Sequence, residues 1–162
     1  YLARLHAAKT RIFQALVAGG SLPLRRGIIR IVDEAHVAGM KLAVCSTASM
    51  ESVLSVLDLM GQQRKSRFEQ VLAGDVVRHK KPDPEIYLLA LERLGVKAAE
   101  CVVIEDSQIG MRAALSAGIN CLVTTSAYTG DENFNGANRV VTDLGDPSAV
   151  HITLADLQQF CV

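Results

Sequence analysis

The chain has 162 residues, and 49% of them are hydrophobic, which is enough for the buried core of one α/β domain. Its 17 Lys and Arg residues balance its 17 Asp and Glu residues, so the formal net charge of zero gives no electrostatic reason to expect binding to nucleic acid or to an anionic membrane surface. No apolar run reaches the length of a membrane span, so we expect no membrane insertion.

An amphipathic helix is expected at the start of the chain, because apolar side chains recur there at helical spacing. They are Leu2, Leu5, Ile12, Phe13, Leu16 and Val17, and Gly19-Gly20 ends the helix. The chain starts with Tyr1 rather than Met, inside this helix, and we therefore expect a fragment or a processed product.

The rest of the chain alternates between helical and strand-like segments. The expected helices cover about residues 27–38, 49–59, 84–94, 107–118 and 153–160, and the expected strands cover residues 41–45, 70–73, 101–104, 121–123 and 139–141. The helix over 84–94 has the clearest ends, with Asp83 as its N-cap, Pro84 at its first position and Gly95 as its stop. This alternation predicts an α/β fold with a doubly wound parallel sheet.

The four cysteines show no CxxC spacing, which does not favour a zinc site. They are Cys45, Cys101, Cys121 and Cys161, and three of them lie in or at the start of expected strands. We interpret them as small core residues of a protein in a reducing compartment, with disulfides or a thiol nucleophile as the alternatives.

Polar side chains follow three of the expected strands at the points where the strands end. Ser46 and Thr47 follow the first, Lys81 closes the loop after the second, and Glu105 and Asp106 follow the third. Because ligands bind beyond the carboxyl ends of strands in open parallel sheets, we expect these groups on one rim. The hydroxyls and the lysine suit a phosphate group, and the adjacent carboxylates suit Mg²⁺. Such a set could supply the strong electrostatic stabilisation that phosphate monoester cleavage needs.

Each of these groups also has a purely structural interpretation. Ser46 could cap the following helix, Lys81 could be a solvated loop lysine, and Glu105-Asp106 could form an exposed turn. Their order along the chain, each at the end of a strand, favours a shared site.

Three segments resemble, in order, motifs II, III and IV of the haloacid dehalogenase (HAD) superfamily: residues 43–47 (AVCST), 80–84 (KKPDP) and 102–110 (VVIEDSQIG). The resemblance covers nearly the whole chain and is greatest to the CbbY-like group, which is related to β-phosphoglucomutase and to plastid sugar-bisphosphate phosphatases. It implies a HAD Rossmann-like core and Mg²⁺-dependent chemistry on a phosphorylated sugar.

The resemblance also implies roles for individual residues. Ser46 matches the motif II hydroxyl that binds the transferring phosphoryl group, and Thr47 helps to position the phosphate. Lys81 matches the motif III lysine that holds phosphate and nucleophile. Glu105 and Asp106 match the motif IV acids that bind Mg²⁺.

Residues 1–20 resemble the end of a helical cap, and residues 21–162 resemble an incomplete HAD core. In related enzymes a lysine in the last cap helix reaches the substrate, which makes Lys9 a candidate phosphate-binding residue. Its alternative is a solvated lysine on an amphipathic helix. Residues 22–26 would be the hinge between cap and core.

The family's motif I, DxDGT, is not found, because no Asp of this sequence is followed two residues later by another Asp. In related proteins its strand lies between the strands that end at Ser46 and at Asp106. We therefore expect two unpaired strand edges, and we expect a missing segment or another chain to complete the sheet and supply the nucleophilic aspartate. The isolated chain is expected to be inactive.

Three functions remain open from the sequence. The leading one is hydrolysis of a sugar phosphate or sugar bisphosphate through an aspartyl-phosphate intermediate. The others are a phosphomutase on the same scaffold and a non-catalytic subunit or scaffold that has lost the nucleophile. A chloroplast location follows from the resemblance alone, and a cytoplasmic one is the alternative.

Overall fold

The computed structural model describes residues 2–161 and, within the first helix, the side chains of Arg4 and of residues 8–18. In chain order the elements are α1 (Leu2–Ala18), α2 (Ile28–Val37), β1 (Leu42–Cys45), α3 (Met50–Asp58), α4 (Gln62–Lys65), β2 (Phe68–Leu72), α5 (Glu85–Leu94), the short 3-10 helix η1 (Ala98–Glu100), β3 (Val102–Glu105), α6 (Gln108–Ser116), β4 (Asn120–Thr124), β5 (Arg139–Val141) and α7 (Leu154–Gln158). Among these residues, no helix is both long and apolar enough to cross a membrane.

The predicted α/β alternation is confirmed, with differences at the ends of elements. Strand β5 has the predicted bounds, whereas β2 begins two residues earlier than predicted, and the single turn α4 was not predicted. The prediction of Asp83 as the N-cap of α5 is wrong, because Pro84 already has helical dihedral angles and occupies the cap position. Asp83 still accepts a hydrogen bond from the Glu85 amide at 3.0 Å, and it thus satisfies one free N–H of the first turn.

The described strands form two parallel sheets rather than one. Strand β1 pairs with β2, and β3 pairs with β4, which in turn pairs with β5. Within residues 2–161, β1 and β3 therefore each have a paired neighbour on one side only, as the family resemblance implies. The burial agrees with two open edges: every residue of β1 is only partly buried, whereas Cys121, Leu122 and Val123 of β4 are fully buried.

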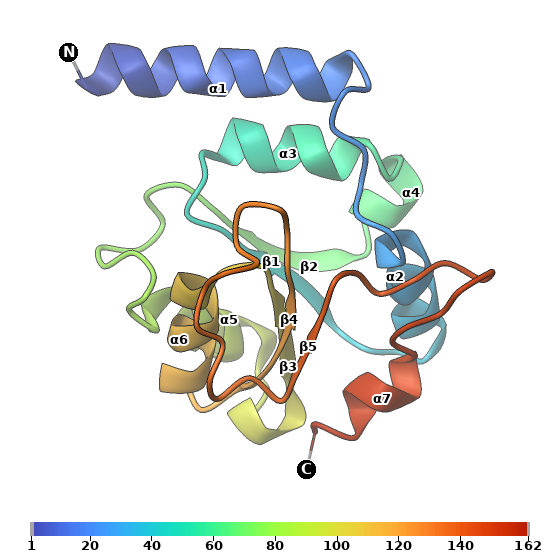
Figure 1. Cartoon of the computed structure of the whole chain (residues 1–162). Helices are drawn as coiled ribbons and strands as arrows, with labels where there is room; N and C mark the ends of the chain where they lie inside the picture. The colour runs from blue at the N-terminus through green and yellow to red at the C-terminus, as the bar shows by residue number, and fades with distance from the viewer. Residues whose placement is uncertain (1, 162) are drawn as a thin grey trace.

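Helices cover both faces of the strands, and the strand residues alternate between the two sides. Cys121 and Val123 pack with α5 and α6 on one face. Leu122 packs with α2 and α7 on the other face. Helices α5 and α6 lie together on one side of the strands in Figure 1, and α2 and α7 lie together on the opposite side. This is a doubly wound arrangement.

The two sheets are held together by helices that contact elements of both. Helix α5 contacts β1 and β2 as well as α6, which packs on β3 and β4. On the opposite face, Ile28 of α2 contacts the cluster around Leu122 and also a third cluster formed by α3 and Val44 of β1. The break in the sheet therefore has a helical layer on each side.

Helix α1 lies outside these layers and packs on α3 (Figure 1). The segment that follows it is tied to the carboxyl ends of β4 and β5, because the Arg25 guanidinium donates to the carbonyl oxygens of Thr125 at 2.5 Å and Thr142 at 2.6 Å. The division into a cap remnant (1–20) and a core (21–162) stays a prediction.

Candidate active site

The centre of the candidate site is the side chain of Lys81, in the loop between β2 and α5. Its ammonium group lies 2.9 Å from the carbonyl oxygen of Cys45, the last residue of β1. It also lies 2.5 Å from Oε1 of Glu105, the last residue of β3. Lys81 thus connects the carboxyl ends of the two strands that the break in the sheet separates.

The ion pair between Lys81 and Glu105 is nearly shielded from water, since the two side chains are 10% and 9% exposed. Tyr87 completes the cluster: its hydroxyl accepts from Lys81 at 2.9 Å and donates to Oε1 of Glu105. Oε2 of Glu105 accepts from the Asp106 amide at 3.3 Å. Buried charges are stable only when paired and hydrogen-bonded, and each group here has such partners.

Burial changes the acid–base properties of the groups around the ion pair. It raises the pKa of Tyr87 far above its ordinary value, and the neighbouring negative charge of Glu105 adds to this, so the phenol keeps its proton. Burial also raises the pKa of the Cys45 thiol to about 11 and that of Cys121 to about 12. Both cysteines therefore stay protonated near neutral pH, which excludes them as thiolate nucleophiles and agrees with their interpretation as core residues.

Glu105 can occupy its position because residue 110 has no side chain. A Cβ atom on Gly110 would lie 1.9 Å from Oε2 and 2.1 Å from Cδ of Glu105. Gly110 lies in the first turn of α6, where Ser107 accepts a hydrogen bond from its amide at 3.2 Å. The start of α6 therefore forms the wall against which the carboxylate rests.

Asp106 differs from Glu105 although the two are adjacent. Its side chain is exposed, and no described side chain donates a hydrogen bond or forms an ion pair with its carboxylate. Adjacent carboxylates, one anchored and one free, are a suitable oxygen donor set for a hard cation. Glu105 and Asp106 are thus the residues that could hold a metal ion.

Ser46 lies at the same edge as Lys81, directly after β1. Its amide donates to Leu72 at 2.9 Å, which extends the parallel ladder, and its Oγ accepts from the Ala48 amide at 3.1 Å. The interpretation of Ser46 as a helix cap is wrong, because Ser49 caps α3 and accepts from the Ser52 amide. Thr47 is exposed beside it.

Lys9 stands apart from this cluster. It is exposed on α1 and makes no hydrogen bond or ion pair with the described side chains. Its role as a phosphate ligand stays a prediction, as do the roles of the other site residues.

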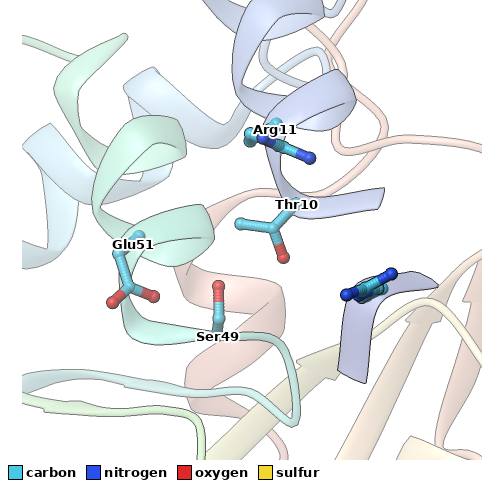
Figure 2. Close-up of a pocket in the computed structure, with 5 residues that line it drawn as sticks. Thr10, Arg11, Ser49 and Glu51 are labelled. Carbon is cyan, nitrogen blue, oxygen red and sulfur yellow. The ribbon is translucent and has the colours of Figure 1, made fainter. Parts of the chain in front are cut away.

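A cleft of about 650 Å³ separates α1 from the start of α3, and it is lined by Arg4, Thr10, Arg11, Ser49 and Glu51. Figure 2 shows Thr10 and Arg11 on α1 and Ser49 and Glu51 on the opposite wall. Ser49 comes three residues after Ser46, so the cleft adjoins the turn that carries the candidate phosphate-binding hydroxyls.

A second group of possible metal ligands consists of His79 and Asp83 on the loop that carries Lys81 and of Glu85 at the start of α5. Its central carboxylate is already used, since Glu85 accepts from the Arg78 amide at 3.0 Å and from the His79 amide at 2.8 Å. These bonds lower the pKa of Glu85. Glu85 therefore braces the loop that carries Lys81.

Sequence reasoning missed Tyr87, and it included Gly110 only as the last residue of the motif IV segment without assigning it a role. The hydrophobic periodicity of α5 places Tyr87 among core residues and gives no sign of its polar partners. One signal was available: Tyr87 places a polar oxygen on the apolar face of a helix that begins just after Lys81.

The comparisons with known proteins agree with this fold. A sequence model of the haloacid dehalogenase-like hydrolases matches residues 2–118. A CBBY-like protein of Arabidopsis thaliana is 46% identical over 156 residues, which are 96% of this chain and 49% of that protein. The chain thus spans about half the length of this relative.

Two solved structures of CbbY from Rhodobacter sphaeroides superpose with a TM-score of 0.85, and each alignment covers 96% of this chain and 68% of theirs. One, at 40% identity, is a complex with phosphate. The other, at 41% identity, is an aspartate-to-asparagine mutant in complex with xylulose-(1,5)bisphosphate.

The contact between Gly110 and Glu105 makes the first prediction. Alanine is favoured over glycine inside a helix by about 1 kcal/mol, but the new Cβ would displace the buried carboxylate. We expect Gly110→Ala in the complete protein to lower the free energy of unfolding by roughly 1–3 kcal/mol, measured by urea denaturation. Gly130→Ala is the control, because the nearest atom to its Cβ would lie 3.5 Å away. A more stable Gly110→Ala protein would contradict the described packing.

Proposed function

The chain belongs to the haloacid dehalogenase-like hydrolase family, and from that premise we propose that the complete protein is a Mg²⁺-dependent phosphatase that acts on a sugar phosphate or sugar bisphosphate. The observation that carries the proposal is the position of Lys81, whose ammonium joins the carboxyl ends of β1 and β3. A phosphoryl group bound at that point would meet the Ser46 hydroxyl on one side and the two acids on the other. The phosphate and xylulose-(1,5)bisphosphate complexes of CbbY support this substrate class.

We assign the metal to Glu105 and Asp106. Two observations support the fit: Gly110 leaves the room that the Glu105 carboxylate fills, and the Asp106 carboxylate is free of described partners. When bound, Mg²⁺ would offset negative charge between the anionic substrate and the acidic site. Ser46 would donate its hydroxyl to a phosphoryl oxygen. Lys81 would attract the phosphoryl group by its positive charge, because its three N–H groups already have acceptors within the protein.

The nucleophile is proposed to come from outside residues 1–162. An aspartate at the end of a strand placed between β1 and β3 would lie beside Lys81, and it would form the aspartyl-phosphate intermediate. The same strand would pair with both open edges. A segment of the complete protein or another chain could supply it, and the relative lengths support the first source.

The proposal is tested by phosphate release from sugar monophosphates and from xylulose bisphosphate by the complete protein, with and without Mg²⁺. We expect Mg²⁺-dependent release. Conversion of a sugar monophosphate to its isomer without release would indicate the phosphomutase, and neither reaction would indicate the non-catalytic scaffold. The chloroplast location stays a prediction, which a fluorescent fusion of the complete protein in plant cells would test.

Replacement of Lys81 is expected to separate activity from stability. Lys81→Met should lower kcat/KM on the order of 100-fold or more, and it should also cost roughly 3–5 kcal/mol of stability because it leaves the Glu105 charge buried and unpaired. Adding Glu105→Gln removes that charge. The double variant should therefore regain stability without regaining activity. Recovery of both would remove Lys81 from the chemistry.

Replacement of Asp106 is expected to affect Mg²⁺ binding and the activity that depends on it, but not the stability of the protein. Asp106→Asn should weaken Mg²⁺ binding on the order of 10-fold or more, measured by calorimetry and by the Mg²⁺ concentration for half-maximal activity. Its melting temperature without metal should stay unchanged, because the carboxylate has no described partner. Asp131→Asn, another exposed acid, is the control. Unaltered metal affinity would contradict the assignment.

Residues 1–162 expressed alone should release no phosphate and should associate through the open edges of β1 and β3. Sedimentation velocity would measure the association of residues 1–162, and urea unfolding would measure their stability, each in comparison with the complete protein. A monomeric fragment that unfolds cooperatively would argue against a missing central strand.

A further inference from the structure

Tyr87 is a buried polar residue that the assigned roles leave unexplained. It lies on the inner face of α5 between apolar neighbours such as Ile86 and Ala90, and it is only 4% exposed. A hydroxyl in such surroundings is costly unless it is hydrogen-bonded, and a phenylalanine would fill the same space without that requirement. The hydroxyl is therefore informative.

The polar contacts of the Tyr87 side chain with described residues are those with the ion pair of the candidate site. Its ring centroid lies 4.7 Å from the Lys81 ammonium, in cation–π geometry. Its hydroxyl accepts from Lys81 at 2.9 Å and donates to Oε1 of Glu105. The one phenol thus fixes the positions of both charged groups.

These contacts give the two carboxylate oxygens of Glu105 different hydrogen-bond partners. Oε1 accepts hydrogen bonds from the Lys81 ammonium and from the Tyr87 hydroxyl. Among the described residues, Oε2 accepts only from the Asp106 amide, at 3.3 Å. Without the hydroxyl, Lys81 could donate to either oxygen of Glu105, and the carboxylate could rotate. With it, the oxygen on the side of Asp106 keeps its remaining lone pair.

We propose that Tyr87 is a positioning residue that holds Oε1 of Glu105 on Lys81 and thereby keeps Oε2 available, beside Asp106, for a divalent cation. This inference rests on the proposed function, because it takes Glu105 and Asp106 as the metal ligands. It adds a residue of α5 to a site otherwise built from strand ends, loops and the first turn of α6.

The test is Mg²⁺ binding to the complete protein by calorimetry, without substrate. Tyr87→Phe removes one oxygen, and we expect Mg²⁺ affinity to fall about 3- to 10-fold, as for loss of one ordering hydrogen bond. Tyr128→Phe, at a tyrosine that is 97% exposed, is the control and should bind as the unsubstituted protein does. Equal affinity of the Tyr87→Phe protein would overturn the proposal.

A double-mutant cycle separates positioning from general packing. If Tyr87 acts through the Glu105 carboxylate, Tyr87→Phe should have less than about a 2-fold effect on Mg²⁺ affinity in a Glu105→Gln background. An undiminished effect there would mean that the phenol acts through packing, and the proposal would fail. Failure of the unsubstituted protein to bind Mg²⁺ at all would instead refute the metal assignment itself.

A second measurement keeps the phenol at position 87 and therefore does not depend on whether the Tyr87→Phe variant folds. With 3-fluorotyrosine at position 87, the ¹⁹F resonance should shift on addition of Mg²⁺, since the hydroxyl contacts the proposed ligand. The same label at position 128 should not respond. A ¹⁹F resonance at position 87 that does not shift, in a protein that binds Mg²⁺, would overturn the proposal.

Discussion

The buried ion pair between Lys81 and Glu105 is the constraint on which the rest of the site depends. It joins the end of β1 to the end of β3 across a line where no described strand pairs. A lysine ammonium inside a protein needs several acceptors, and here they are a backbone carbonyl, a phenol and a carboxylate. Because these acceptors come from β1, α5 and β3, the pair can form only when both sheets and the helical layer beside them are in place.

The surroundings of this pair follow from the same constraint. The loop that carries Lys81 is braced by Glu85, which accepts from two amides of that loop. Glu105 rests against a helix turn in which only glycine leaves enough room. Small thiols at Cys45 and Cys121 fill the adjacent core without adding charge, since burial keeps them protonated. A charged site is therefore embedded in an apolar core, and each buried side-chain nitrogen or oxygen among the described residues has a hydrogen-bond partner.

The sequence was sufficient for most elements because their signals are local. Periodicity and caps such as Ser107 and Gly95 lie within a few residues of the helices that they delimit. The single turn α4 has too few residues for any periodicity. The role of Tyr87 could not be read because its partner Glu105 lies 18 residues further along the chain, and only the fold brings the two together. The split of the sheet was predicted from family resemblance and not from any pattern within these residues.

The geometry also links the chemistry of the rim to the cleft under α1. The turn over residues 46–49 begins with the hydroxyl of Ser46 and ends with Ser49, which caps α3 and lines the cleft beside Arg11. The middle of the turn is fixed to the neighbouring loop, because the Ala48 carbonyl accepts from the Gly74 amide at 2.7 Å. The cleft and the candidate phosphate-binding hydroxyls thus share one short turn held by this hydrogen bond, whereas Lys81 and Glu105 are anchored separately in the core.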